Sequence, residues 1–318
     1  KTANGLAVST NSPGAVDAIN RFQFEIISSG QNADTIIAAA KQYPDCVIIQ
    51  TYAAMFYLYA QDDLATTQSI PYLICAEQHL EKANLRERLL FNAVQNWQML
   101  NYQGAITDLT ALVRLYPQDT LAVKVAEWIF YCLGQAYSAT QFKALCEAAA
   151  PHQRDNPYFL ASHSFALELT GHYPAAMAKA EEALDLEPIS PWAHHTIAHC
   201  LLMNGKMDKG IEFLQSVSAT WVAIFPLLKG HNNWHLALFY LANRNDQKVI
   251  ERFENGIFGL VPGTILEQMD AISLLWRLEM AGFPQDQLLH QIRSQLNHHP
   301  YEYYTGFNAV HLMYCLAR

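Results

Sequence analysis

A period of 34 residues organises the middle of the sequence. Pro157 is followed 34 positions later by Pro191, and Gly171 is followed by Gly205 at the same distance. Apolar residues recur between these positions with the spacing of a helix face, and each glycine interrupts that spacing. Each period is therefore predicted to fold as two helices joined by a turn. The clearest copies cover residues 156–188 and 190–222.

Small residues mark a second position of the same period. Ala176 is followed 34 residues later by Gly210, where the two helices of a pair should cross and a bulky side chain would force them apart. A 34-residue period with small residues at the turn and at the crossing is typical of the tetratricopeptide repeat. A single helix pair cannot bury its apolar face, so successive pairs must stack. We therefore expect an all-α fold, a right-handed α-solenoid of antiparallel helix pairs.

Weaker copies of the pattern lie on both sides. The trio Tyr102, Ala105 and Pro117 recurs 71 residues further along the chain. Further helix pairs are expected at residues 33–60 and 234–254. In the second of these, Asn243 stands at the turn, where glycine would be usual. The chain is therefore predicted to form a single helical-repeat domain over residues 1–318.

The composition limits the classes of function. With 51% hydrophobic and 15% charged residues, the chain should be a packed globular protein without extended disorder. Its formal net charge of -9 argues against a nucleic-acid groove, which would need clustered Lys and Arg. The acidic balance suits a cytoplasmic protein. Because the sequence starts at Lys1 without a methionine, we expect that a preceding segment has been removed.

Neither a membrane span nor a disulfide framework is expected. The longest apolar run, Cys46 to Ala60, is interrupted by Gln50 and Thr51 and is shorter than the ~20 residues that a span requires. The six cysteines include no Cys-x-x-Cys pair and stand among apolar residues, so they are predicted to be reduced and buried.

Two pairs of histidines share a spacing of four residues. His195 and His199 form one pair, and His231 and His235 form the other. On a helix, positions i and i+4 lie on one face, so each pair presents two imidazoles in one direction. The zinc pair of His-Glu-x-x-His has the same spacing, but the glutamate that acts as base in such proteases is absent from both pairs. A protease of that kind is therefore not expected.

The histidine pairs predict a candidate pocket in the C-terminal half, residues 190–318. If their helices face each other, His199, His231 and His235 could bind a divalent metal such as zinc. A histidine-lined pocket for an anionic or polar small molecule is a second interpretation, and plain packing of half-buried imidazoles is a third. The candidate pocket residues are His195, His199, His231, Trp234, His235, Asp270 and His311.

The other histidines and the nucleophiles give weaker signals. His163 is predicted to be a packing residue, and His172 and His194 are predicted to be solvated. His298 and His299 are expected in a loop. The sequence has neither a Gly-x-Ser-x-Gly turn nor a cysteine with a paired histidine signature, so it identifies no catalytic residue.

The two histidine blocks, WAHHTIAHCLLMNGK and HNNWHLALFYLANRN, resemble the tetratricopeptide repeat protein 38 family. The similarity extends into DAISLLWRLEMAGF and GFNAVHLMYCLA and covers most of the chain. Leu202 stands where that family usually has Glu, and Glu127 where it often has His. The resemblance implies a helical-repeat fold and no particular reaction. The matching residues are Trp192, Ala193, His195, Ala198, His199, Met203 and Gly205, then His231, Asn232, Trp234, His235, Ala237 and Leu238.

Two functions stay open from the sequence. The first is a scaffold that binds a protein or peptide partner on its stacked helices. With only 20 Lys and Arg, a generic receptor for peptide carboxylates is not expected. The second is an enzyme, or a small-molecule or metal-binding protein, that uses the histidine pocket. The irregular segments 215–230 and 255–264 are candidate walls of that pocket. The apolar end HLMYCLAR predicts a homodimer or docking back onto the array.

Overall fold

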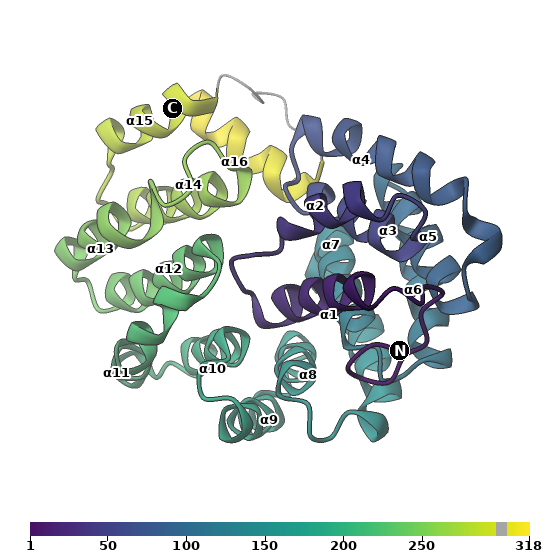
Figure 1. Ribbon diagram of the computed structural model, residues 1–318. Coiled ribbons are helices and arrows are strands. Elements are labelled where there is room, and N and C mark those ends of the chain that lie inside the picture. The colour runs from purple at the N-terminus through teal and green to yellow at the C-terminus, as the bar shows by residue number, and fades with distance from the viewer. Residues whose placement is uncertain (297–303) are drawn as a thin grey trace. The chain divides into compact units, whose positions relative to one another are not determined.

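The computed structural model describes residues 1–296 and 304–318, the side chain of Asp63 excepted. Within these residues all regular secondary structure is helical, which confirms the all-α prediction. The contacts divide the chain into two compact units: residues 1–59 with 64–193, and residues 60–63 with 194–318. Figure 1 follows the chain through its helices.

The first unit contains most of the N-terminal helix pairs. Its helices are α1 (Pro13–Ser28), α2 (Thr35–Gln42), α3 (Val47–Leu58), α4 (Asp63–Glu77), α5 (Leu85–Gln98), α6 (Tyr102–Leu115), α7 (Thr120–Ala149), α8 (Pro157–Leu169) and α9 (Tyr173–Leu186), with short 3₁₀ helices η1 (Leu80–Lys82) and η2 (Ala150–His152).

The pair α8 and α9 has the boundaries that the repeat predicts. The side chain of Asn156 caps α8 by accepting hydrogen bonds from the backbone N–H groups of its first turn, and Pro157 occupies the first helical position. Gly171 lies between the helices with a φ of +79°, a conformation that glycine adopts without strain. Ala176 is fully buried at the start of α9.

Two local features shape α5 to α7: a helix cap that also forms an ion pair, and a break within α7. Asp119 caps α7 through the N–H of Ala122 and also binds Arg86 of α5 at 2.9 Å, with both side chains buried. Within α7, Gly134 has φ 125° and ψ 100°, so the chain there forms two helices that meet at this residue without a loop. The sequence analysis did not predict that break.

The second unit carries the histidine blocks. Its helices are α10 (Pro191–Met203, of which residues 194–203 belong here), α11 (Met207–Val217), α12 (Pro226–Ala242), α13 (Asp246–Arg252), α14 (Ile265–Met280), α15 (Asp286–Gln295) and α16 (Gly306–Ala317), with the 3₁₀ helix η3 (Ser218–Ala223) and the π-helix η4 (Phe253–Ile257).

The small residue of the second repeat makes its tightest contact with the following helix. A Cβ added to Gly210 of α11 would lie 2.2 Å from the ring of Phe239 in α12. The expected reason for a small residue here is the crossing of the two helices within a pair. The nearest atoms belong to α12, the first helix of the next pair, so Gly210 also governs how one repeat packs on the next.

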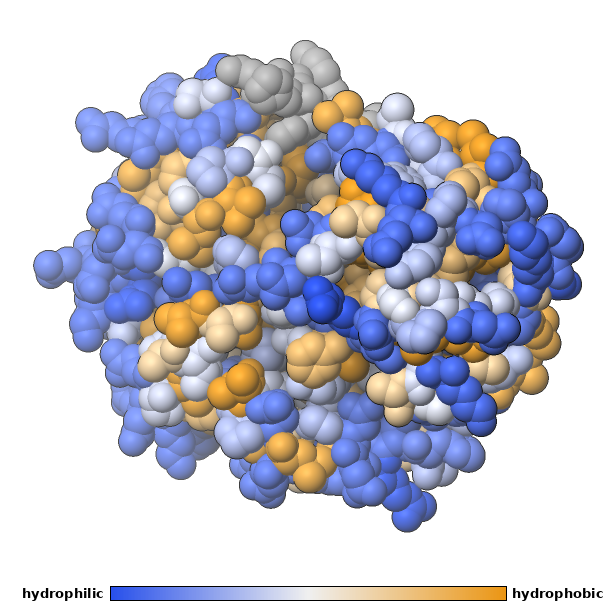
Figure 2. Space-filling model, viewed as in Figure 1, coloured by the Kyte–Doolittle hydropathy of each residue, from blue (hydrophilic) through white to orange (hydrophobic). Residues whose placement is uncertain are grey.

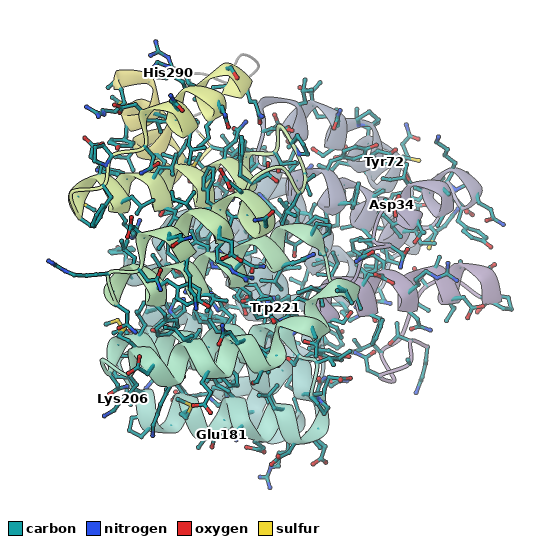
Figure 3. The ribbon with its side chains drawn as sticks, turned by 90° about the vertical axis from the view of Figure 1, so that its left-hand side faces the viewer. Asp34, Tyr72, Glu181, Lys206, Trp221 and His290 are labelled. Atoms are coloured by element: carbon teal, nitrogen blue, oxygen red, sulfur yellow. The ribbon has the colours of Figure 1, made fainter. Side chains whose placement is uncertain are left out.

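The turns and irregular segments differ in detail from the predictions. Between α12 and α13 the left-handed residue is Arg244, with a φ of 55°, and not Asn243. The irregular segments contain η3 and η4 and pack against neighbouring helices. Trp221 of η3 is 1% exposed and lies beyond the end of α11, whose start Lys206 marks in Figure 3. A Cβ added to Gly256 of η4 would lie 2.9 Å from the side chain of Asn233 in α12.

The surface and the cysteines bear on three further predictions. Among the described residues, no helix combines the length and the apolar character needed to cross a bilayer. All six cysteines are unbridged; Cys75 is half-buried and the others are buried. The face in Figure 2 intersperses hydrophobic residues with hydrophilic ones. On α16, Leu312 and Cys315 are buried whereas Met313 is 70% exposed, so the apolar terminus docks only in part.

The packing of Gly210 predicts the effect of one methyl group. Gly210→Ala should lower the free energy of unfolding by about 1–3 kcal/mol, because the fully buried ring of Phe239 would have to move. Denaturant unfolding of both proteins would measure the difference. The control is Gly306→Ala at the start of α16, where a Cβ meets nothing within 4 Å. Equal stability of Gly210→Ala and the unchanged protein would contradict this account.

Candidate functional site

The two histidine pairs meet in the second unit. His195 and His199 lie on α10, and His231 and His235 lie on α12. The ring centroids are 4.4 Å apart within the first pair and 4.8 Å within the second. Between the helices, the ring of His195 lies 5.1 Å from that of His231, and the ring of His199 lies 4.6 Å from that of His235. Four imidazoles therefore form one cluster, which we call the histidine cluster.

Three nitrogens of the cluster converge. The Nε2 of His231 lies 3.1 Å from the Nε2 of His195 and 3.2 Å from the Nε2 of His235. All three residues offer a ring nitrogen within 4.8 Å of the others. The sequence analysis grouped His199 with His231 and His235. In the structure His195 takes that place, and His199 borders the group.

Asp270 of α14 fixes the ring of His231. The Nδ1–H of His231 donates to the carboxylate, with distances of 3.0 and 3.1 Å to its two oxygens. Burial alone would lower the pKa of His231, but the charge and hydrogen bond of Asp270 outweigh burial and raise that pKa above its ordinary value. With the proton on Nδ1, the lone pair of Nε2 in the neutral ring points at the other two histidines.

His235 has the opposite electrostatic setting. Burial, followed by the nearby rings of His199 and His231 and the charge of Arg277, holds the pKa of His235 well below its ordinary value. This imidazole therefore stays neutral at physiological pH. Its Nδ1 is buried and has no hydrogen-bond partner, so its contacts through Nε2 and the ring faces hold it in place. A neutral imidazole is the form that binds a metal ion.

Trp234 and Arg277 flank the cluster. The indole of Trp234 stacks on the ring of His231 with centroids 5.5 Å apart and an interplanar angle of 8°. The guanidinium of Arg277, from α14, lies 5.2 Å from the centre of the same indole. Its Nη1 also donates to the carbonyl and hydroxyl oxygens of Ser273. Trp234 was among the predicted pocket residues, whereas Arg277, seven residues after Asp270 on the same helix, was not.

His311 does not join the three nitrogens. Its Nδ1–H donates to the carbonyl of Phe307 within α16 at 2.8 Å, and its ring packs against Trp276. Burial is the main reason that the pKa of His311 is lowered. His311 thus lies in the same unit as the cluster without sharing its point of convergence.

The predictions for His172, His194, His298 and His299 have different outcomes. His194 was expected to be solvated, which is wrong: it is 0% exposed, and its Nδ1 accepts a hydrogen bond from Trp221 at 3.3 Å. The reason is that α10 is covered on that side by η3. His172 is exposed, as predicted. His298 and His299 lie outside the described residues.

The two nitrogen separations around His231 fit a tetrahedral metal ion. Zinc–nitrogen bonds of ~2.0–2.1 Å in a tetrahedron place two ligand nitrogens about 3.3 Å apart. The separations of 3.1 and 3.2 Å around His231 are close to that value. A carboxylate that accepts the second N–H of a ligating histidine is the usual outer partner in such sites, and Asp270 has that position. His195, His231 and His235 could therefore hold a divalent metal.

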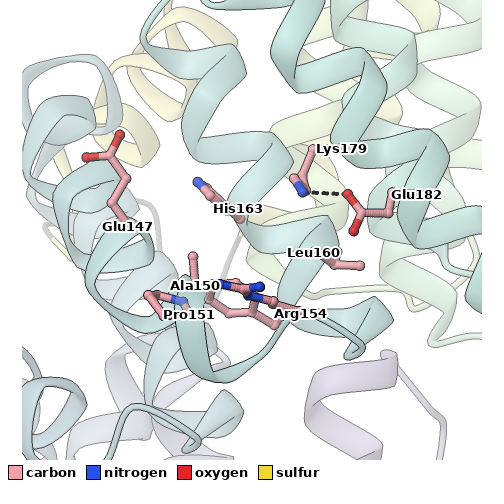
Figure 4. A pocket seen from close by; sticks show the side chains of 9 residues that line it. Glu147, Ala150, Pro151, Arg154, Leu160, His163, Lys179 and Glu182 are labelled. Carbon is pink, nitrogen blue, oxygen red and sulfur yellow. Dashed lines mark hydrogen bonds and ion pairs between the residues drawn. The ribbon is translucent and has the colours of Figure 1, made fainter.

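A separate cavity of about 390 Å³ lies in the first unit (Figure 4). It is bordered by the end of α7, η2, α8 and α9, and His163 contributes one wall. Its acidic and basic side chains balance one another, and Lys179 pairs with Glu182 there. Such a lining favours no sign of ligand charge, so this cavity is a weaker candidate site. The charged or titratable lining residues are Glu147, Arg154, His163, Lys179 and Glu182.

The comparisons with known proteins agree with the repeat architecture. The tetratricopeptide repeat family matches residues 169–220. A solved tetratricopeptide repeat protein from Parabacteroides merdae is similar with a TM-score of 0.53 and 13% identity, covering 83% of this chain and 98% of that one. A Rap protein solved in complex with competence and sporulation factor has a TM-score of 0.52 and 14% identity, covering 96% and 98%. At these identities the two structures share the fold alone.

These findings define the class of the protein. The chain is a tetratricopeptide-like helical-repeat protein, and the predicted fold class of an α-solenoid built of antiparallel helix pairs is confirmed. Proteins of this architecture are interaction scaffolds in general. The chemistry particular to this chain is the histidine cluster.

The Asp270–His231 pair predicts a pH dependence of the metal-free protein. Asp270→Asn should lower the pKa of His231 below its ordinary value, because burial then acts without the opposing carboxylate. In the unchanged protein the raised pKa stabilises the fold below the ordinary histidine pKa, and this contribution disappears as pH rises through the folded-state pKa. The variant should therefore lose more stability at pH 5.5 than at pH 8.5.

Histidine side-chain NMR and unfolding at the two pH values would test this prediction. The matched control is Asp286→Asn, the same substitution on an exposed carboxylate of α15. An unchanged His231 titration in Asp270→Asn would refute the role given to the carboxylate.

Proposed function

We propose that this tetratricopeptide-like protein binds one divalent transition metal ion, with zinc as the first candidate. The proposed ligands are the Nε2 atoms of His195, His231 and His235. One observation carries the proposal: the Nε2 of His231 lies at metal-ligand separations from the Nε2 atoms of His195 and His235, on two helices, and a carboxylate orients the ring of His231. We also propose that the chain is a member of the tetratricopeptide repeat protein 38 family, which the histidine blocks resemble.

The proton chemistry of the cluster supports a cation at its centre. Without a bound cation, the Nε2 of His231 lies next to two other Nε2 atoms. A pair of these nitrogens can form a hydrogen bond only when one of the two carries a proton. A divalent ion accepts all three lone pairs at once. The ion also makes use of the neutral state that burial imposes on His235.

A protein or peptide partner is the second candidate function. Its support is the repeat match at residues 169–220 and the fold shared with the Rap protein, which was solved in complex with competence and sporulation factor. The two functions are compatible, since a metal ion can hold repeats in the arrangement that binds a partner. A small-molecule ligand at the cluster and a homodimer through the apolar face of α16 also remain proposals; that face exposes Phe307, Val310 and Met313.

Zinc titration of the metal-free chain, prepared without an affinity tag, tests the metal proposal. Calorimetry should give one tight site per chain, and a hundredfold excess of zinc over Kd should stabilise the fold by about 2.7 kcal/mol. His231→Ala should weaken binding by more than about 100-fold, since loss of an outer partner alone costs roughly 10–100-fold. Affinity should also fall as pH drops through the raised pKa of His231, because a second proton then competes with the metal for its Nε2.

The matched control is His290→Ala. His290 is an exposed histidine of α15 in the same unit (Figure 3), so its loss should leave the tight site intact. Zinc binding of equal affinity in His231→Ala and the unchanged protein would show that the metal binds elsewhere, and the proposal would fail.

A further inference from the structure

His199 borders the three-nitrogen group from the helix that supplies His195. It lies one turn further along α10 on the same face, with the two ring centroids 4.4 Å apart. Its ring is also 4.6 Å from that of His235 on α12. For comparison, the rings of His195 and His235, which both belong to the group, are 4.7 Å apart. His199 is therefore as close to two of the proposed ligands as those ligands are to each other.

The exposure of His199 differs from that of its neighbours. His195 and His235 are each 3% exposed, whereas His199 is half-buried. The half-buried ring of His199 is less enclosed by packing than the two buried rings, and the wells of an imidazole about χ2 are broad. A turn about χ1 or χ2 can therefore bring a ring nitrogen of His199 toward the point where the other three converge.

The coordination number of the metal favours a fourth protein ligand. Zinc in structural sites takes four ligands in a tetrahedron, and the three nitrogens leave one position to fill. Imidazole suits zinc, copper and nickel well, and an imidazole already held beside the ion binds in an intramolecular step. A water molecule offers a weaker donor and no such advantage.

We propose that His199 supplies the fourth ligand, so that the two histidine pairs close around a single ion. This inference rests on the proposed function. A closed set of four protein ligands leaves no position for a substrate, which makes the site structural and not hydrolytic. Because α10 and α12 begin successive helix pairs, the ion links one repeat to the next. Metal supply then controls how firmly these repeats are held together.

Cobalt(II) in place of zinc tests the fourth ligand, because its visible absorption reports the coordination of the ion. The whole chain loaded with cobalt should show the spectrum of a four-coordinate site, and added thiocyanate should leave it unchanged. His199→Ala should still bind cobalt through the other three histidines, with affinity lower by at least about 100-fold, since loss of an outer partner alone costs roughly 10–100-fold. Its spectrum should change with thiocyanate, which enters the vacated position. His290→Ala is the matched control and should behave like the unchanged protein.

X-ray absorption at the cobalt edge gives a second measurement that needs no variant. Four imidazoles per ion in the unchanged protein are expected, and three imidazoles with an oxygen donor would overturn the inference. A thiocyanate response of the unchanged protein equal to that of His199→Ala would overturn it as well. If the unchanged protein binds no cobalt and no zinc, the proposed function itself fails, which is a distinct result.

Discussion

The second unit depends on the close approach of α11 to α12 at Gly210. The glycine faces the fully buried ring of Phe239, and no larger residue fits at that distance. Phe239 lies one helical turn after His235 on α12. The contact that fixes the position of α12 therefore also fixes the direction of its histidine side chains. Packing density explains why such a contact is stringent: a close-packed interior has no room to absorb even one methyl group without shifting a helix.

Within the histidine cluster, the rings of His231 and His235 have opposite electrostatic surroundings. Asp270 favours a charged or strongly polarised ring at His231, whereas burial keeps His235 neutral. The two rings are neighbours, so a proton on one disfavours a proton on the other. Three helices supply the parts: α10 and α12 give the imidazoles, and α14 gives the carboxylate and Arg277. A site assembled from separate helices requires the repeat packing to be correct before its chemistry can exist.

The sequence predicted the parts of this arrangement that follow from periodicity. The 34-residue period located α8 to α11, and the spacing of four placed each histidine pair on one helix face. The sequence could not decide which ring of a pair faces the point of convergence, because His195 and His199 lie on nearly the same side of their helix. Their different burial comes from tertiary contacts.

Other features had no local signal at all. The burial of His194 depends on η3, whose segment was predicted only as a candidate pocket wall. Arg277 acquires its role from the position of Trp234 on another helix. The left-handed residue of the turn after α12 is Arg244, one position beyond the Asn243 that stands at the expected glycine position.

The stack of Trp234 on His231 gives the protein an internal optical reporter. Indole emission is sensitive to an adjacent electron-poor ring, and the two planes here are nearly parallel at 5.5 Å. A proton or a metal ion on the imidazole of His231 withdraws electron density from the ring on which the indole of Trp234 stacks. The intrinsic fluorescence of the chain should therefore change when the imidazole of His231 binds a proton or a metal ion, without any attached dye.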